Sequence, residues 1–376
     1  RPLLGEEERA AVLDVLSSPQ LVHGPRTRMF ENSFAASLGP SAHATSVSSC
    51  TAGLHLAYMH LNLGPGDEVI VPAQTHVATA HAVEITGAKP VFVDCELGTG
   101  NIDVSAIDAA ISERTRAISV VHFLGLPADM DGINALARKK NLFVVEDCAL
   151  AVGSSLGGTA CGLLGDVGSF SFYPVKHMTT GEGGMVVSQH RNVVESIANM
   201  KAFGYDRGPA ERTVPGVYDI ARLGINYRMN EISAAIGLEQ LKKVPEFSRR
   251  RAANASSLRS AFANIAEIDV LADGDATRIH SNYCVVGILK GRMAPLRNQV
   301  VAALSDAGIG TSVYYPVPLP LSAYYSAKYS YDWRGFPNSV AISNNSIAFP
   351  VGPHLNEDDM HVIGEALKSA VLKVGS

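Results

Sequence analysis

The chain has 376 residues, of which 47% are hydrophobic and 18% charged, so it predicts a globular protein with one large and one smaller domain rather than a disordered chain. The formal net charge of −5 comes from acidic and basic residues mixed along the chain without a basic stripe, which argues against nucleic acid as a partner. No apolar run is long enough to span a bilayer and no signal peptide precedes the first predicted helix, so we expect a cytoplasmic protein without membrane contact.

The cysteines support the same compartment. They are five, an odd number, and they are scattered through apolar segments without the spacing of metal ligands. This pattern is typical of buried free thiols in a reducing cytoplasm, so we expect no metal site. The residues are Cys50, Cys95, Cys148, Cys161 and Cys284.

The chain opens with two predicted helices, over residues 6–16 and 26–38, in which apolar residues recur at helical spacing. Small and hydroxyl residues then fill positions 48–53 and precede an apolar run around Leu56. A helix that opens in this way presents free backbone N–H groups and the positive end of its dipole, which together can cradle a phosphate. Taken alone, the same residues favour an ordinary Ser/Thr N-cap.

From residue 68 onward, short β-branched runs alternate with helical stretches. Continuous apolar strands separated by helices favour a mostly parallel sheet that helices cover on both faces. In such a sheet a ligand lies beyond the carboxyl ends of the strands, so the residues that follow each strand are the candidates for function. The predicted strands span residues 68–72, 90–93, 117–121 and 142–145, and the predicted helices span 76–85, 104–111 and 131–140.

One lysine follows such a strand. The segment from Ser169 to Gly184 begins as an apolar, aromatic strand, turns at Pro174, presents Lys176 and closes on the glycine-rich turn 181–184. Glycines let a backbone adopt positive φ or approach a ligand closely. A lone amine in this position is suited to chemistry, although a solvated loop residue is the ordinary explanation for a single lysine.

The last third of the chain predicts a smaller α/β lobe. A long charged helix over residues 242–263 would bridge to it. The predicted fold class is therefore α/β, with a large domain over residues 1–245 and a small C-terminal domain over residues 246–376. Further helices are predicted over residues 192–203, 229–241, 296–307 and 358–372, and further strands over 284–289 and 311–315.

Asp147 follows the predicted strand 142–145. A carboxylate at a buried strand end is costly unless it meets a positive partner or caps the next helix. Pyridoxal phosphate offers a positive partner, because its protonated pyridine nitrogen is a cation that makes the ring an electron sink. This cofactor also needs a lysine for its aldehyde, a helix N-terminus and a serine for its phosphate, and a flat side chain beside its ring. The chain offers Lys176, Thr51 with Ala52, Ser171 and His76 for these roles.

These segments, in this order, resemble the DegT/DnrJ/EryC1/StrS family of PLP-dependent nucleotide-sugar aminotransferases, a branch of the fold-type I aminotransferases. Ser171 lies 24 positions and Lys176 lies 29 positions after Asp147, which matches the family's acid, phosphate serine and lysine. The resemblance covers nearly the whole chain, and the ordered set is specific although each motif alone is weak. The matching segments are 66–72 (GDEVIVP), 122–130 (HFLGLPADM), 146–149 (EDCA), 169–184 and 226–231 (NYRMNE).

The resemblance implies a fold-type I PLP-dependent transferase and assigns roles to its cofactor residues. Lys176 would carry the cofactor as an imine and then act as the base that moves the proton during transamination. Asp147 would contact the pyridine nitrogen, and the phosphate would be held by Thr51, Ala52 and Ser171.

The resemblance also implies a homodimer with shared active sites. Asn226 is similar to the family residue that reaches the phosphate from the other subunit, with Arg228 beside it. The turn that contains Glu182 and the loop around Tyr314 and Tyr315 would border the sugar.

Three positions depart from the family pattern. His76 stands where the family usually has an aromatic residue stacked on the ring; it could stack more weakly, donate a hydrogen bond, or simply start a helix. Leu150 stands where a glutamine commonly touches the ring oxygen of the cofactor. Pro320 stands where many members have a histidine near the substrate, so the departures affect the substrate more than the cofactor.

The implied reaction is transamination. Relatives with histidine at the imine position remove a sugar hydroxyl, whereas this chain retains Lys176, with His177 as a neighbour in the loop. The implied substrate is a nucleotide-linked keto-(6-deoxy)sugar, aminated at C4 or alternatively at C3, with L-glutamate as the amino donor. A PLP-dependent sugar dehydratase and a catalytically silent PLP-binding regulatory protein are the alternatives.

Overall fold

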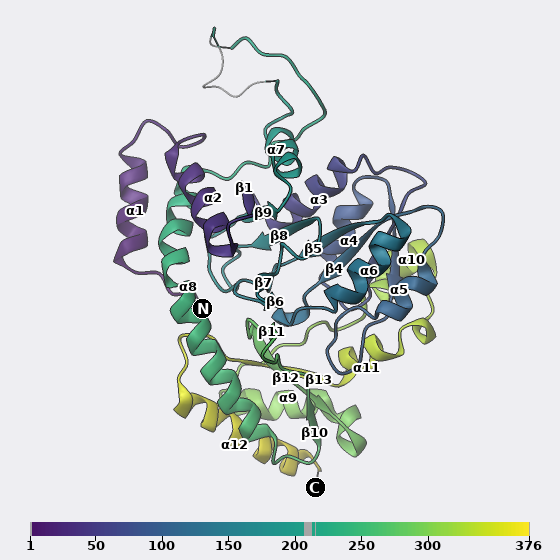
Figure 1. Ribbon diagram of the computed structural model, residues 1–376. Coiled ribbons are helices and arrows are strands. Elements are labelled where there is room, and N and C mark those ends of the chain that lie inside the picture. Colours follow the sequence, from purple (N-terminus) through teal and green to yellow (C-terminus); the bar gives the residue numbers. More distant parts are fainter. Residues whose placement is uncertain (1, 207–212, 215, 376) are drawn as a thin grey trace.

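The computed structural model describes residues 2–206, 213–214 and 216–375, and a seven-stranded sheet lies at its centre (Figure 1). Its strand order is β1-β9-β8-β5-β4-β2-β3, and these strands are parallel except for β9. The predicted mostly parallel α/β sheet is thus confirmed. In spatial order the strands are β1 (His43–Val47), β9 (Gly184–Ser188), β8 (Val167–Ser171), β5 (Phe143–Asp147), β4 (Thr115–Val121), β2 (Glu68–Pro72) and β3 (Lys89–Val93).

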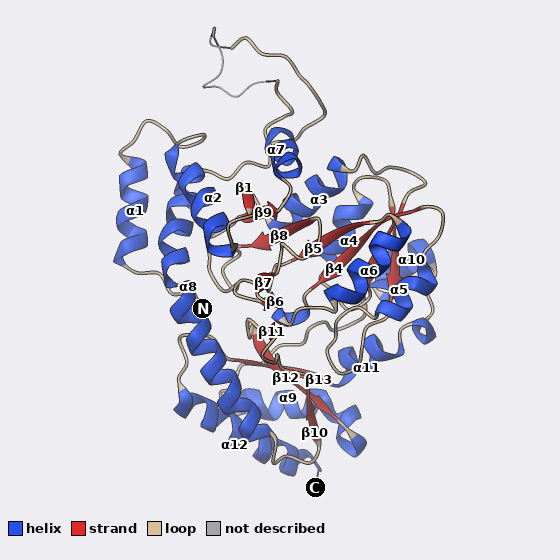
Figure 2. Cartoon of the chain, in the orientation of Figure 1, coloured by secondary structure: helices blue, strands red, loops and turns tan. Residues whose placement is uncertain are grey.

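Helices cover both faces of this sheet (Figure 2). In β2, Val69 and Val71 join a core cluster with residues of α3, α4 and α7, whereas Ile70 between them joins a second cluster with residues of α5 and α6. Successive strand residues point to opposite faces, so only an uninterrupted apolar run satisfies a sheet covered on both sides. The helices are α3 (Cys50–His60), α4 (Val77–Glu84), α5 (Val104–Ala110), α6 (Met130–Lys140) and α7 (Arg191–Met200).

The helix α8 (Glu231–Phe262) corrects the prediction of two separate helices in this region. It is a single 32-residue helix that continues through Pro245. A proline removes one backbone donor and usually ends or kinks a helix, but packing on both sides of it can outweigh that cost. Before the proline, α8 packs closely against α2 (Pro25–Leu38) at Gly237, and after it against α12 (Glu357–Gly375) at Ala261. The first helix, α1 (Glu6–Leu16), also packs on α8 (Figure 1).

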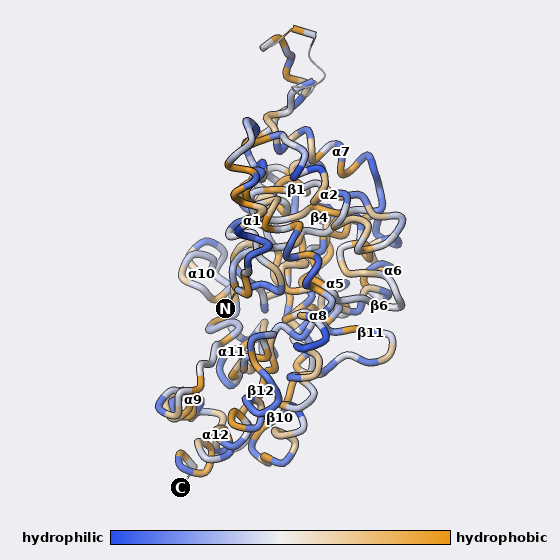
Figure 3. Tube along the Cα trace, turned by 90° about the vertical axis from the view of Figure 1, so that its left-hand side faces the viewer, coloured by the Kyte–Doolittle hydropathy of each residue, from blue (hydrophilic) through white to orange (hydrophobic). Residues whose placement is uncertain are grey.

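A second, smaller sheet lies at the other end of α8 and is stacked below the first along the length of the molecule (Figure 3). Its order is β10-β12-β13, with antiparallel pairing throughout. Residues of α8, α9 and α12 form a separate apolar cluster on it around Phe262 and Phe349. The elements are β10 (Ile268–Val270), β12 (Cys284–Leu289), β13 (Ser346–Pro350), α9 (Arg297–Asp306) and the 3-10 turn η3 (Gly291–Leu296).

The strand predicted over residues 311–315 is wrong. Within the described residues of this stretch, pairing is limited to one isolated bridge between Ser312 and Ala348. Ser312 both donates to and accepts from Ala348, at 3.0 and 2.8 Å. The chain then reaches Pro316 and Pro318, which have no backbone N–H to donate, so the pairing cannot extend.

Part of the C-terminal sequence returns to the large sheet. Leu319, Tyr325 and Phe336 join the core cluster that contains Ala80 of α4. This return runs through η4 (Leu319–Leu321), α10 (Ala323–Tyr329), η5 (Trp333–Gly335) and α11 (Pro337–Asn345). A third small sheet joins β11 (Arg278–Ile279) to β6 (Ser155–Leu156) and β7 (Thr159–Ala160). The domain boundary between residues 245 and 246 therefore stays a prediction.

Two predictions about the chain as a whole can be compared with the structure. The five cysteines are all buried, and each is a free thiol, as predicted. Among the described residues, none of the helices combines the length and the apolar composition that crossing a membrane would need.

Candidate active site

A pocket of about 360 Å³ lies at the carboxyl ends of β5 and β8. Asp147 is the last residue of β5, Ser171 is the last residue of β8, and Lys176 follows in the next loop. All three line this pocket. Residues that are 24 and 29 positions apart in sequence therefore meet in space, because β5 and β8 are neighbouring parallel strands.

Asp147 is held in place by neighbouring donors and is only 5% exposed. Its Oδ2 accepts a hydrogen bond from Thr79 Oγ1 at 2.7 Å, and its Oδ1 accepts one from the Ala149 N–H at 3.1 Å. The thiol of Cys50 lies 3.7 Å from the same Oδ1. The carboxylate thus caps the turn that follows β5 and also lines the pocket, while its contact with a cofactor nitrogen stays a prediction.

Lys176 is half-buried beside this carboxylate, and its Nζ lies 5.7 Å from the centre of the Tyr283 ring. Burial lowers the pKa of the ammonium group, while the negative charge of Asp147 opposes that shift. A lowered pKa increases the fraction of neutral amine, which is the nucleophilic form. The next residue, His177, lies outside the pocket, where its Nε2 donates to the Ser281 carbonyl at 3.1 Å.

The N-terminus of α3 meets the same pocket. Ser49 is the N-cap, and its hydroxyl accepts a hydrogen bond from the Ala52 N–H at 3.1 Å. Ser49 and Thr51 line the pocket, whereas Ala52 does not. The predicted cap is present, and it coexists with a helix dipole that points its positive end at the pocket.

Gly184 explains how this helix comes so close to the sheet. A Cβ at Gly184 would lie 2.7 Å from the Cys50 backbone nitrogen and 2.7 Å from the Phe170 carbonyl oxygen. A side chain cannot occupy that space without moving backbone, so glycine lets β9 pass directly beside the start of α3.

His76 lies at the exposed edge of the pocket and starts α4. Its Nδ1 accepts a hydrogen bond from the Ala78 N–H at 3.2 Å, which makes it the N-cap of this helix. The centre of its ring lies 6.0 Å from that of Tyr315, at an interplanar angle of 59°. His76, Tyr315 and Leu150 all line the pocket, and the Leu150 carbonyl accepts a hydrogen bond from Ser281.

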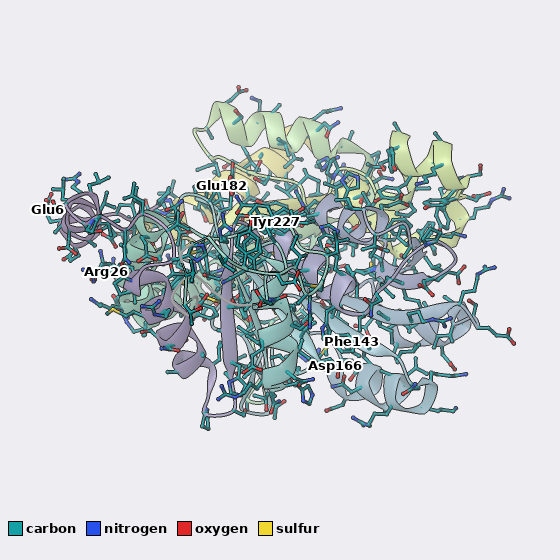
Figure 4. All side chains as sticks on the ribbon, turned by 90° about the horizontal axis from the view of Figure 1, so that it is seen from above. Glu6, Arg26, Phe143, Asp166, Glu182 and Tyr227 are labelled. Atoms are coloured by element: carbon teal, nitrogen blue, oxygen red, sulfur yellow. The ribbon has the colours of Figure 1, made fainter. Side chains whose placement is uncertain are left out.

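Glu182 also lines the pocket, from the exposed turn that ends at β9. Gly181 in this turn has a φ of 80°, as the glycine-rich sequence predicted. Figure 4 labels Glu182 on the side of the C-terminal residues, whereas Phe143 and Asp166, at the opposite ends of the strands, lie on the other side.

Asn226, Arg228 and Tyr314 do not line this pocket within the described chain. Asn226 is exposed, and the Arg228 guanidinium lies 5.1 Å from the centre of the Phe203 ring. The hydroxyl of Tyr314 faces that of Tyr283 at 3.3 Å in a neighbouring pocket. The structure therefore brings part of the predicted set together with Lys176 in this pocket and leaves Asn226, Arg228 and Tyr314 outside it. The residues that line it with Lys176 are Thr51, His76, Asp147, Ser171, Glu182 and Tyr315.

Sequence reasoning missed Thr79, which holds Asp147. Its hydroxyl is also 2.7 Å from that of Thr75, which precedes the N-cap of α4. The signal that could have shown Thr79 is a hydroxyl residue in the first turn of a helix that follows a parallel strand, because that turn lies at the same edge of the sheet as Asp147. Tyr173 and Cys50 line the pocket as well and were not singled out for it.

Behind Asp147 lies a buried polar cluster of His122, Glu146 and Cys148, whose ligand atoms are within 4.8 Å of one another. His122 Nε2 lies 2.8 Å from Glu146 Oε2, and its Nδ1 accepts from the Ala128 N–H at 3.1 Å. Because both ring nitrogens of His122 already have hydrogen-bond partners, we interpret the cluster as a hydrogen-bonded support for β5 rather than as a set of metal ligands.

The sheet, the lysine after β8 and the acid at the end of β5 define the fold-type I class of PLP-dependent transferases. Comparison with known proteins adds the family. The model of the DegT/DnrJ/EryC1/StrS aminotransferase family matches residues 2–368, so the chain belongs to this family. The predicted family, fold class and enzyme class are thereby confirmed.

The relatives agree with one another. The chain is 35% identical over 374 residues to the spore coat polysaccharide biosynthesis protein SpsC of Bacillus subtilis. The matched region covers 98% of this chain and 96% of the relative. The aminotransferase TlmJ from Streptoalloteichus hindustanus has a TM-score of 0.91 at 31% identity, covering 100% and 99% of the two chains. The putative sugar aminotransferase Spr1654 from Streptococcus pneumoniae, in its PMP form, has a TM-score of 0.93 at 30% identity, covering 99% and 98%. A PLP form of Spr1654 is similar as well.

Proposed function

We propose that this chain is a PLP-dependent aminotransferase that converts a nucleotide-linked keto-(6-deoxy)sugar to the amino sugar. The observation that carries the proposal is the pairing of Lys176 and Asp147 in one pocket at the ends of adjacent strands. The family is one of aminotransferases, and the relatives include a sugar aminotransferase with PLP and PMP forms.

The residues of the pocket fit pyridoxal phosphate. The N-terminus of α3, with Thr51, and the hydroxyl of Ser171 offer donors for a phosphate. The Ala52 N–H would add to them by exchanging its present acceptor, Ser49 Oγ, for the phosphate. Asp147, oriented by Thr79 and Ala149, offers a carboxylate for a protonated ring nitrogen. When bound, the cofactor supplies an aldehyde that takes up nitrogen and a ring that accepts electrons from the adjoining carbon.

The residues of this chain would then position and move protons. Lys176 would hold the cofactor and would serve as the base at the substrate carbon, and burial lowers its pKa toward the neutral amine that both roles need. Asp147 would keep the ring nitrogen protonated, because an anion beside it favours the charged form. His76 and Tyr315 would flank the ring, while Leu150 offers only its carbonyl and apolar side chain.

The finer assignments are also proposals. We place the amination at C4, with C3 as the alternative, and we take L-glutamate as the amino donor. Glu182, Tyr314 and Tyr315 would border the sugar. Asn226 and Arg228 would enter the pocket of a partner subunit in a homodimer, which accounts for their absence from the pocket of their own chain. A cytoplasmic location and the domains 1–245 and 246–376 complete the proposal.

The test is spectroscopic. We expect the purified protein to be yellow with bound cofactor, to lose that colour on adding L-glutamate, and to regain it with a keto-sugar substrate. Lys176→Ala should abolish the colour cycle, while Lys139→Ala, at an exposed lysine of α6, should leave it intact. A protein that stays colourless with added cofactor would instead support the silent binding protein, and a yellow protein that answers to no amino donor would support the dehydratase.

A further inference from the structure

A second pocket of about 360 Å³ lies on the other side of the Lys176 loop, between that loop and the smaller sheet. Lys176 lines both pockets, so this second one reaches the residue at which nitrogen would be exchanged. Its other walls come from β12, β13, α8 and the bridge at Ser312. The proposed function uses Lys176 and Tyr314, two of its lining residues, and assigns no role to the rest of this pocket.

Arg251 of α8 lines this pocket and is only 6% exposed. Its Nη1 donates to the carbonyls of Asn282 and Tyr283, at 3.3 and 3.1 Å. Among the described residues these are its only hydrogen bonds, and its buried Nε has no partner. A buried guanidinium normally meets a carboxylate, so this one lacks the counter-charge that would offset its desolvation.

The lining of the pocket supplies no such counter-charge. It contains no aspartate or glutamate among the described residues. Burial raises the pKa of the Cys284 thiol to about 12 and also raises that of the Tyr283 phenol, so both groups are neutral near pH 7. Burial lowers the pKa of Arg251 only to about 10, so the guanidinium remains a cation. The pocket is therefore positive, with polar hydroxyls at Ser312 and Tyr314.

We propose that this second pocket, which we call the Arg251 pocket, binds a carboxylate group of the amino donor. This inference rests on the proposed function and adds the position of the donor to it. A guanidinium recognises a carboxylate with two parallel hydrogen bonds when its fork is available. Occupation would give Arg251 the partner that it lacks.

The geometry favours the donor over the nucleotide-sugar. In an α-amino acid the amine and a carboxylate are attached to the same carbon, so a carboxylate site must adjoin the residue that exchanges the nitrogen. Lys176 satisfies that condition, because it lines both pockets. In a nucleotide-linked sugar the hexose ring separates the reacting carbon from the diphosphate, so its anionic group belongs farther away.

The experiment compares Arg251→Met with Arg249→Met. Arg249 lies on the same helix, is exposed and pairs with Glu246, so its replacement is the matched chemical change outside the pocket. Calorimetry measures the binding of glutarate, a dicarboxylate that cannot react, to the holoenzyme and to the cofactor-free protein. We expect Arg251→Met to weaken glutarate binding, and to raise the KM for L-glutamate, by at least about tenfold. Arg249→Met should bind glutarate as the wild-type protein does.

A second variant tests the pocket without removing the hydrogen bonds of Arg251 to the backbone. Ser312→Glu places a negative charge in the pocket and should repel the carboxylate, whereas Ser256→Glu, at an exposed position of α8, should not. This pair decides the question if Arg251→Met does not fold.

The proposal fails if glutarate does not bind the wild-type protein. It also fails if the affinity for glutarate is unchanged in Ser312→Glu or in folded Arg251→Met. A third contrary result is that these variants lose affinity for inorganic pyrophosphate and not for glutarate. These outcomes differ from a failure of the proposed function. If the wild-type protein answers to L-glutamate by losing its colour while the variants keep their affinity for glutarate, only the carboxylate assignment falls. If no amino donor changes the colour, the proposed function itself fails.

Discussion

Asp147 is fixed by the protein before any ligand enters. Hydrogen bonds from Thr79 and Ala149 reach its two oxygens, so the carboxylate cannot turn freely toward Lys176. Lys176 has no such bond with any residue that the structure describes, and burial lowers its pKa. The pocket thus holds an oriented acid and a partly desolvated amine. The desolvation of the amine can be measured without a cofactor, through its lowered pKa.

The stability of the cofactor-free protein should report this buried amine. The folded state holds the pKa of Lys176 below its ordinary value of 10.5, so between these two pKa values the unfolded chain binds more protons than the folded one. Stability contributed by this residue therefore rises with pH through that window. We expect the difference in unfolding free energy between wild type and Lys176→Met to grow in favour of wild type as the pH approaches 10.5.

The measurement is urea unfolding at a series of pH values. Lys139→Met is the control, because this lysine is exposed on α6, and its difference from wild type should not follow the pH. A pH-independent difference for Lys176→Met would mean that the amine is as well solvated in the folded state as in the unfolded chain.

The N-terminus of the helix α3 is capped by a side chain and also lines the pocket. The hydroxyl of Ser49 satisfies the Ala52 N–H, and the start of the helix lines the pocket with Thr51. The close passage of β9 at Gly184 holds this end in position. Under the proposed function, this helix end would contribute both to stability and to phosphate binding, and two substitutions at Ser49 would separate the two effects.

We expect Ser49→Ala to lower the free energy of unfolding by about 1 kcal/mol, because the cap is lost. Ser49→Asp should keep the cap and the stability, since aspartate is an equally good N-cap, but its charge should weaken PLP binding by at least about tenfold. Urea unfolding of the cofactor-free protein and titration with PLP measure the two effects. A Ser49→Asp protein that binds PLP as tightly as wild type would show that the phosphate does not lie at α3.

The molecule as a whole leaves several apolar side chains exposed in the segment between α7 and α8. Val217 is 61% exposed, Ile220 64% and Leu223 77%. They immediately precede Asn226, which the family resemblance assigns to the pocket of the other subunit. Exposed apolar groups of this kind are typical of an interface, which agrees with the proposed homodimer.

Subunit complementation tests this proposal. Lys176→Ala and Asn226→Asp chains should each form inactive or weakly active dimers, whereas mixed dimers contain one site with both residues intact. If the chains assort at random, the mixture should recover about a quarter of the wild-type activity. The control mixes Lys176→Ala chains with Asp147→Ala chains. Both residues belong to the pocket of one chain, so every site of a mixed dimer lacks either the lysine or the acid. Equal activity of both mixtures would place Asn226 in the pocket of its own chain or outside the reaction.

The mixing control follows from which chain supplies each residue. Lys176 and Asp147 line the same pocket of one chain, so a dimer of the two variants has one site without the lysine and one without the acid. Only a residue contributed across the interface can be restored by mixing. The readout is the rate of amino transfer after joint refolding of differently tagged chains.

The sequence by itself determined the alternation of strands and helices along the chain. It also singled out Lys176 and Asp147 as candidate site residues. Those features are local or ordered along the chain: β-branched runs fill strands, and the spacing of acid, serine and lysine is a property of sequence. The helix starts at Glu6 and Val104 agree with prediction for the same reason.

The tertiary structure decided what depends on packing between distant segments. α8 continues through Pro245 because helices on both sides hold it, and residues 311–315 form no strand because only Ser312 meets a partner. Thr79 holds Asp147 across 68 positions of sequence, and no described aspartate or glutamate lines the pocket of the Arg251 cation. No local pattern encodes such contacts, because each one exists only when the sheet brings the two segments together.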